Sequence, residues 1–152
     1  MATVKKLVTA WIVLVALAMP ALAGATTKMA SPYDVKTTLD RLEDVMKAKG
    51  ITIFARIDHA AGAKSVGNSL PPTELMIFGN PKLGSPLMAI NREVAFDLPL
   101  KALAWEDADG KVWLAITNPA ELNQVYALAG ADGVIDKMSA AIKALSAKAL
   151  EN

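Results

Sequence analysis

The chain has 152 residues, with 16 Lys and Arg against 15 Asp and Glu, one His and no Cys. This length suits a single domain. The absence of cysteine excludes disulfides, thiolate metal sites and a cysteine nucleophile. A formal net charge of +1 provides no electrostatic basis for nucleic-acid binding.

Residues 1–23 have the three parts of a secretory signal peptide. Two lysines supply the positive start, residues 7–18 form an apolar run, and Ala21-Leu22-Ala23 is an A-x-A cleavage site. A helix needs about 20 apolar residues to span a bilayer, so this run is too short for an uncleaved anchor. We therefore predict cleavage near Ala23 and a periplasmic or secreted protein, not membrane-spanning once processed. Residues 24–152 are expected to form one domain.

The hydrophobic pattern predicts intermingled strands and helices. Strands are expected over 26–30, 51–58, 74–78, 95–106 and 111–117. Helices are expected from the capping residues Asp34, Asn80, Asn118 and Asp132, ending at 49, 90, 129 and 149, with a weak helical turn at 59–67.

Two of these predicted strands carry finer expectations. The alternation in residues 51–58 predicts one buried face, made by Ile51, Ile53, Ala55 and Ile57. Pro99 limits the first part of 95–106 to a sheet edge or a bend. A tight turn at 107–110 joins 95–106 to 111–117 as an antiparallel hairpin. The fold class expected is therefore α+β: a two-layer domain whose mainly antiparallel sheet has helices packed on one face.

His59, the single histidine, follows Asp58 at the end of a predicted strand. Histidine titrates near neutrality and acts as a general base when a carboxylate orients its ring. Adjacent strand residues point to opposite faces, so these two side chains do not meet unless the strand ends between them. No serine or cysteine nucleophile motif accompanies His59, so a structural role is favoured over a catalytic one.

Gly79-Asn80-Pro81-Lys82 places a glycine and a helix start directly after a strand. A helix start offers backbone N–H groups and a partial positive charge to an anion, and Lys82 adds a full charge. The chain lacks both the Walker and the dinucleotide glycine patterns. A capped turn with a solvated lysine is therefore favoured over an anion site.

Charged residues also gather around the predicted hairpin, where Lys101 and Glu106 flank the pair Asp107 and Asp109. Paired carboxylates can bind a hard cation, but aspartates in a turn that ends in glycine bond to the local backbone instead. One histidine and no cysteine cannot form a closed zinc site, and scattered methionines fit core positions. We predict no metal site and no cofactor.

Several segments, taken together, are similar in order and spacing to those of a known family. They are FARIDHAA (54–61), LPPT (70–73), IFGNPK (77–82), PLM (86–88), DLPLK (97–101) and WED (105–107). Over about residues 26–130 the chain resembles the bacterial and archaeal domain of unknown function 302 family, and it departs from the family pattern at 90–92. The resemblance implies a compact α+β domain that often self-associates and has no established activity. It also raises the hypothesis that His59, Asn80, Lys82 and Lys101 converge on one cleft.

Two interpretations of different classes follow. The preferred one is an exported, non-enzymatic binding or interaction domain that holds a small anionic or amphiphilic ligand in an apolar cleft. Its polar anchors would be Arg56, His59, Asn80, Lys82 and Lys101. The alternative is a hydrolase or isomerase with His59 as general base and Lys82 or Arg56 stabilising negative charge. A third interpretation is a homodimer formed through an exposed strand edge, with Pro99 marking where pairing stops.

Overall fold

The computed structural model describes residues 26–152, so the predicted signal peptide lies outside the described residues. The strands are β1 (Thr26–Ser31), β2 (Thr52–Asp58), β3 (Thr73–Gly79), β4 (Leu100–Glu106) and β5 (Val112–Thr117). The helices are α1 (Val35–Ala48), α2 (His59–Ser65), α3 (Pro81–Ile90), α4 (Pro119–Tyr126) and α5 (Asp132–Leu150), with a 3-10 helix η1 (Arg92–Phe96).

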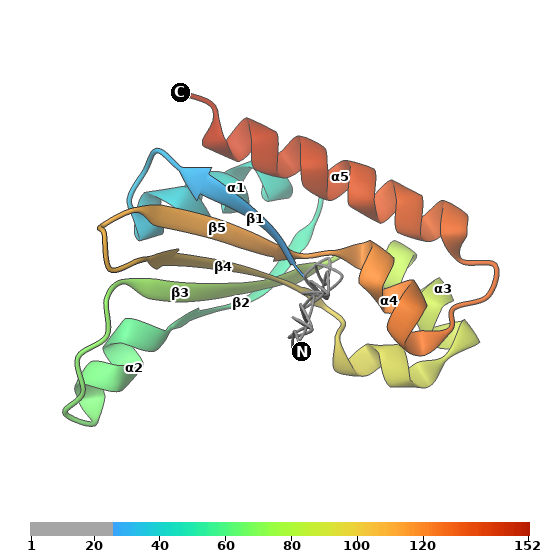
Figure 1. Ribbon diagram of the computed structural model, residues 1–152. Helices are drawn as coiled ribbons and strands as arrows, with labels where there is room; N and C mark the ends of the chain where they lie inside the picture. The colour runs from blue at the N-terminus through green and yellow to red at the C-terminus, as the bar shows by residue number, and fades with distance from the viewer. Residues whose placement is uncertain (1–25) are drawn as a thin grey trace, which may run out of the picture.

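The five strands form one antiparallel sheet in the order β1-β5-β4-β3-β2. The two longest helices, α1 and α5, pack against each other on one face of this sheet (Figure 1). This arrangement confirms the predicted two-layer α+β fold. No helix among residues 26–152 combines the length and the apolar character needed to cross a membrane.

Helix α1 shows how the sequence sets an element of this fold. Asp34 caps it by accepting a hydrogen bond from the Thr37 N–H at 2.7 Å, as predicted. Gly50 follows the helix at φ +70, a backbone conformation that favours glycine. The helix buries one apolar stripe against the sheet, formed by Val35, Leu39, Leu42 and Met46.

The predicted buried face of β2 is wrong in its second half. A β-bulge at Phe54 shifts the register, so Ile53 lies opposite Phe78 while Ala55 lies opposite Ile77. The extra residue turns Ala55 and Ile57 away from the helices and brings Arg56 to the helix-covered side, opposite the buried Met76. Simple alternation fails here because one residue has no partner on the neighbouring strand.

The extended segment predicted from Ala95 is also shorter than expected. Asn91 accepts a hydrogen bond from Glu93 N and starts η1, which ends at Phe96. Pro99 then forms the bend before β4, and the Leu98–Pro99 peptide bond is cis. The prediction of a bend is therefore correct, but β4 is the middle strand of the sheet and not an edge.

Near the C-terminus, α4 ends at Tyr126 and not near Ala129, because Ala127 takes the left-handed conformation at φ +49. Asp132 is the first residue of α5 and not its side-chain cap. Its carboxylate instead accepts a hydrogen bond from Asn123 Nδ2 at 3.1 Å. The inward stripe of α5 lies in the core beside α1, with Met138, Ile142, Leu145 and Ala149.

Candidate functional site

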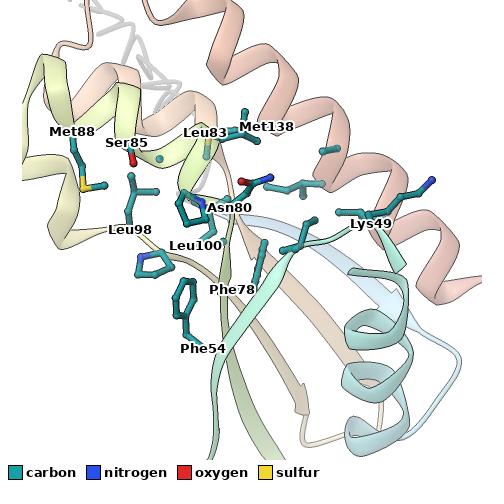
Figure 2. Close-up of a pocket in the computed structure, with 18 of the residues that line it drawn as sticks. Lys49, Phe54, Phe78, Asn80, Leu83, Ser85, Met88, Leu98, Leu100 and Met138 are labelled. Atoms are coloured by element: carbon teal, nitrogen blue, oxygen red, sulfur yellow. The ribbon is translucent and has the colours of Figure 1, made fainter. Parts of the chain in front are cut away.

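A pocket of about 560 Å³ opens where α3 and α5 meet the end of the sheet at which β3 finishes and β4 begins. Its volume lies within the range of small-molecule sites, about 300–1,000 Å³. Figure 2 shows Met88 of α3 and Lys49 at opposite ends of the group of lining side chains. The loop after α1, the strand ends, α3 and α5 all contribute to one hollow.

Apolar side chains dominate the walls of this pocket. They include the aromatic Phe54 and Phe78 and the methionines Met88 and Met138. The others are aliphatic residues from the loop after α1, from α3 and α5, and from the bend and the start of β4: Ile51, Pro81, Leu83, Leu98, Pro99, Leu100, Ala141, Ile142, Ala144 and Leu145. Phe54 is 53% exposed although it is a large apolar residue. An exposed phenylalanine at the mouth of an apolar hollow is a typical contact surface for an apolar ligand.

One glycine lets two of the elements around the pocket approach closely. A Cβ atom on Gly79 would lie 3.2 Å from Pro99 Cβ and 3.5 Å from a ring carbon of Phe54. A Cβ atom on Gly84 would lie 3.6 Å from Leu98 Cδ1, which is an ordinary van der Waals contact. Gly79 thus lets the Pro99 bend lie close to the end of β3 at the pocket wall.

Three lining residues carry polar side chains: Lys49, Asn80 and Ser85. Lys36, Lys47 and Lys148 are held in ion pairs with carboxylates, and Lys49, in the described part of the chain, is not. Lys49 is exposed at the outer end of the group of lining side chains, and its ammonium group points outward from them (Figure 2). An unpaired cation beside an apolar hollow is suited to the anionic end of an otherwise apolar molecule.

Asn80, near the centre of Figure 2, is the predicted site residue that does line the pocket. Its Oδ1 atom caps α3 by accepting from Lys82 N at 3.0 Å, and its carbonyl oxygen accepts from the N–H groups of Leu83 and Gly84. Pro81 has no N–H. The first turn of α3 therefore has no donor left for an anion, and the structure matches the capped turn that the sequence favoured.

Arg56 belongs to an ion-pair cluster away from the pocket. Its guanidinium group lies 2.6 Å from Glu74, 2.5 Å from Asp40 and 3.1 Å from Glu43. The hydrogen bond with Glu74 is the largest cause that raises the pKa of Arg56 above its ordinary value, while burial opposes it. With all three carboxylates engaged, Arg56 ties β2 to β3 and α1, and it is not available to a ligand.

The remaining predicted site residues do not meet Asn80. β2 and β3 are antiparallel, with Asp58 opposite Glu74 and Thr52 opposite Gly79, so His59 and Asn80 lie at opposite ends, about 20 Å apart. Lys82 is exposed on α3 and does not line the pocket. The hypothesis of one cleft shared by these side chains is therefore not met.

Three further residues that the sequence analysis considered have local roles. Lys101 Nζ donates to the carbonyl oxygens of Asp97 at 3.2 Å and Pro99 at 3.4 Å, and the residue lies on the sheet face away from the helices. Asp58 caps α2 by accepting from Ala61 N at 2.8 Å. Asp107 accepts from Asp109 N and Lys111 N, as a turn residue does. Among residues 26–152, no three His, Asp or Glu side chains group as a metal site.

Sequence reasoning missed most of the pocket. The alternation places Phe54 on the solvent side of its strand, and the apolar pattern places Met88 in the core. Met138 is a core residue as predicted, and it also lines the pocket. The available signal was an aromatic residue among Thr52, Arg56 and Asp58 on a supposedly polar face. Methionine side chains adapt to irregular surfaces, so the same residue type that fills a core also lines a variable pocket.

Comparison with known proteins decides the family of this domain. The model of the family described as "Domain of unknown function DUF302" matches residues 27–145. The chain belongs to the DUF302 family. A crystal structure of an uncharacterised conserved DUF302 protein from Bacillus stearothermophilus has 19% sequence identity and a TM-score of 0.66. It covers 84% of this DUF302 chain and 97% of its own, and it shows that the two share a fold.

Curated relatives of this DUF302 chain include proteins named fluoride-specific ion channels. The Brucella suis protein FluC 1 is 50% identical over 98 residues, which are 64% of this chain and 39% of that protein. The Brucella abortus protein FluC 1 is 50% identical over 98 residues, which are 64% of this chain and 36% of that protein. The chain thus spans less than two-fifths of the curated relatives that it matches.

Proposed function

We propose that this DUF302 chain is an exported domain that binds a small amphiphile with an apolar chain and an anionic head group. The apolar pocket between α3, α5 and the sheet end carries the proposal. Its volume of about 560 Å³ is lined by aromatic, aliphatic and methionine side chains, and such a lining binds the apolar groups of a ligand more favourably than it binds water. Burying each methylene group of such a ligand contributes about 0.8 kcal/mol.

Lys49 provides the preferred position for the head group. It lies at the pocket margin, where a carboxylate, sulfate or phosphate would keep contact with water while its chain enters the hollow. The amide of Asn80 supplies a second polar contact deeper among the lining side chains. This pairing of one exposed cation with an apolar interior selects an amphiphile rather than a small, fully hydrated anion.

The hydrolase or isomerase alternative receives no support from the geometry. His59 is exposed at the start of α2, and the carboxylate beside it in sequence is engaged in capping that helix. Arg56 is held by three carboxylates, and Lys82 lies at the other end of the β2–β3 pair. A general base and its anion-stabilising partner must instead face one substrate.

The relatives named fluoride channels bear on where such a domain acts. The matched part is less than two-fifths of those proteins, and residues 26–152 here contain no helix able to cross a membrane. We infer that in those proteins the part outside the match forms the channel, and that the DUF302 part is an accessory domain at the membrane surface. Fluoride itself does not suit an apolar pocket, because burying a small charged ion there lacks compensating donors.

Thermal unfolding with three matched probes tests the binding proposal. We expect dodecanoate to stabilise the purified, delipidated protein by about 2.7 kcal/mol when present at 100 times its Kd. At the same concentration as dodecanoate, we expect 1-dodecanol to stabilise the protein less and sodium fluoride not at all. Absence of any stabilisation by either twelve-carbon probe would contradict the proposal.

Replacing Lys49 with methionine tests the position of the head group. We expect Lys49→Met to weaken dodecanoate binding up to about 5-fold, since an exposed ion pair contributes about 0.2–1 kcal/mol. Binding of 1-dodecanol should not change. Lys143→Met removes an exposed lysine of α5 that does not line the pocket, and it should leave both affinities unchanged. Equal effects of the two variants on dodecanoate would rule out Lys49 as the head-group contact.

Export is tested on the protein recovered from its own cells. We expect it in the periplasmic or secreted fraction, with a mature N-terminus at Gly24 after cleavage of residues 1–23. Intact mass and N-terminal sequencing identify the cut. A second site after Ala25 would also agree with export, whereas unprocessed chain confined to the cytoplasm would refute it.

A further inference from the structure

Three large apolar side chains, here named the apolar tip, are exposed where three short elements end. Ile90 is the last residue of α3, Phe96 is the last residue of η1, and Val125 is the last but one of α4. Their exposed fractions are 46%, 90% and 67%. Single exposed apolar residues are common on proteins, whereas a group of them marks a contact surface.

Two hydrogen bonds bring the three element ends together. Asn91 Nδ2 donates to the carbonyl oxygen of Tyr126 at 3.0 Å, and the hydroxyl group of Tyr126 donates to Asp97 Oδ2 at 2.6 Å. Each of these three bonded residues directly follows one residue of the apolar tip in the chain. Because neighbouring Cα atoms are about 3.8 Å apart, the apolar tip surrounds this one junction.

The surroundings of the apolar tip are poor in charge. Residues 83–91 and 122–131 contain no Asp, Glu, Lys or Arg. Arg92 and Glu93 of η1 and Lys82 at the start of α3 are exposed, and neither cation forms an ion pair within the described part of the chain. An apolar surface with free cations nearby is complementary to a lipid surface, in which phosphate groups lie above acyl chains.

The apolar tip is continuous with the walls of the amphiphile pocket. Met88 of α3 lines the pocket, and Ile90 ends the same helix. Leu98, two residues after Phe96, also lines the pocket. The tip residues themselves do not line it, so they are not needed to hold the ligand. They are instead placed to contact whatever lies beside the pocket.

We propose that the apolar tip docks this domain on a lipid bilayer, from which the pocket takes its amphiphile. This docking rests on the proposed function, because apolar chains leave water for the bilayer and the bilayer is therefore where such ligands collect. Separate side chains at element ends can enter a fluid interface, whereas a protein partner needs a complementary surface of about 1,000 Å². Three side chains give a weak, reversible attachment, since its strength follows the apolar area buried.

Flotation with vesicles of phosphatidylethanolamine and phosphatidylglycerol tests the docking. We expect the purified protein to float with the vesicles, and Phe96→Ser to lower its partition coefficient about 10-fold, which is the effect of withdrawing one phenyl ring from apolar surroundings. Phe96 makes few contacts at 90% exposure, so its replacement should preserve the unfolding midpoint.

Val66→Ser is the matched control for this substitution. Val66 is 73% exposed and follows α2, which lies at the opposite end of the molecule from α3 (Figure 1). We expect it to float like the wild type. A wild-type protein that stays out of the vesicle fraction overturns the docking, as does equal flotation of Phe96→Ser and Val66→Ser.

Stabilisation of the same preparations by dodecanoate separates the docking from the proposed function. A protein that binds dodecanoate but does not float keeps the pocket and loses the docking. A protein that floats through Phe96 but is not stabilised by dodecanoate keeps the docking surface and refutes the proposed function. We expect Phe96→Ser to bind dodecanoate like the wild type, because Phe96 does not line the pocket.

Discussion

Replacing Arg56 with methionine is expected to lower the free energy of unfolding by about 2 kcal/mol at pH 7. The change leaves Asp40, Glu43 and Glu74 facing one another without the guanidinium group that holds them. Removing one partner of a fully buried pair costs about 3–5 kcal/mol, whereas an exposed pair contributes about 0–1 kcal/mol. The Arg56 side chain is 23% exposed, so its contribution falls between these limits.

The effect of this substitution should depend on pH in a definite direction. Hydrogen bonds from Lys36 and then Arg56 hold the pKa of Asp40 below its usual 3.8, and those from Lys47 and Arg56 hold the pKa of Glu43 below its usual 4.5. A lowered carboxyl pKa stabilises the folded state above the unfolded pKa, and this stability is lost as the pH falls through the folded value. The difference between wild type and Arg56→Met should therefore shrink below about pH 4.

Urea unfolding at pH 7 and pH 3.5 measures both expectations. Lys36→Met is the matched control, because it removes a cation from the same Asp40 where the lysine side chain is 78% exposed, and it should cost well under 1 kcal/mol. A loss for Arg56→Met no larger than that of the control would show that the cluster does not hold β2 against β3 and α1. A difference that grows on acidification would contradict the assigned carboxylates.

Filling the pocket with Ala141→Phe should lower the affinity for dodecanoate about 50-fold. Ala141 lines the pocket from α5, and a phenyl ring there occupies space that ligand methylenes would fill. Excluding three methylene groups removes about 2.4 kcal/mol of burial, which corresponds to this factor. Isothermal titration of the delipidated protein measures the change.

The matched control for this substitution is the neighbouring residue of the same helix. Ala140 is exposed and does not line the pocket, so Ala140→Phe imposes the same helix propensity without reaching the hollow. We expect it to retain the wild-type affinity. Unchanged binding by Ala141→Phe, with a preserved unfolding midpoint, would show that the ligand occupies another surface.

The fold could be predicted from the sequence where local signals agree with one another. Asp34 and Gly50 mark the ends of α1, Asn80 and Pro81 start α3, and the turn before Gly110 joins β4 to β5. Each of these positions has a cap or turn chemistry that acts over a few residues. Strand order required long-range pairing and was not predicted.

The site was less predictable for a physical reason. Sequence reasoning selected polar residues at element ends, but the antiparallel pairing of β2 and β3 sends His59 and Asn80 to opposite ends. The bulge at Phe54 then placed Arg56 under α1, where carboxylates from α1 and β3 neutralise it. The pocket is instead made by apolar side chains, and apart from Phe54 on a polar strand face they carry no local signal that separates a ligand surface from a core.

Native mass spectrometry of the protein purified without detergent from the cells that produce it tests the central claim most directly. The account predicts a bound species of a few hundred daltons on the wild-type chain, released by organic extraction as an anionic amphiphile, and absent from Ala141→Phe. A wild-type chain that carries no such species and takes up no dodecanoate would contradict it, as would a species that Ala141→Phe retains in full.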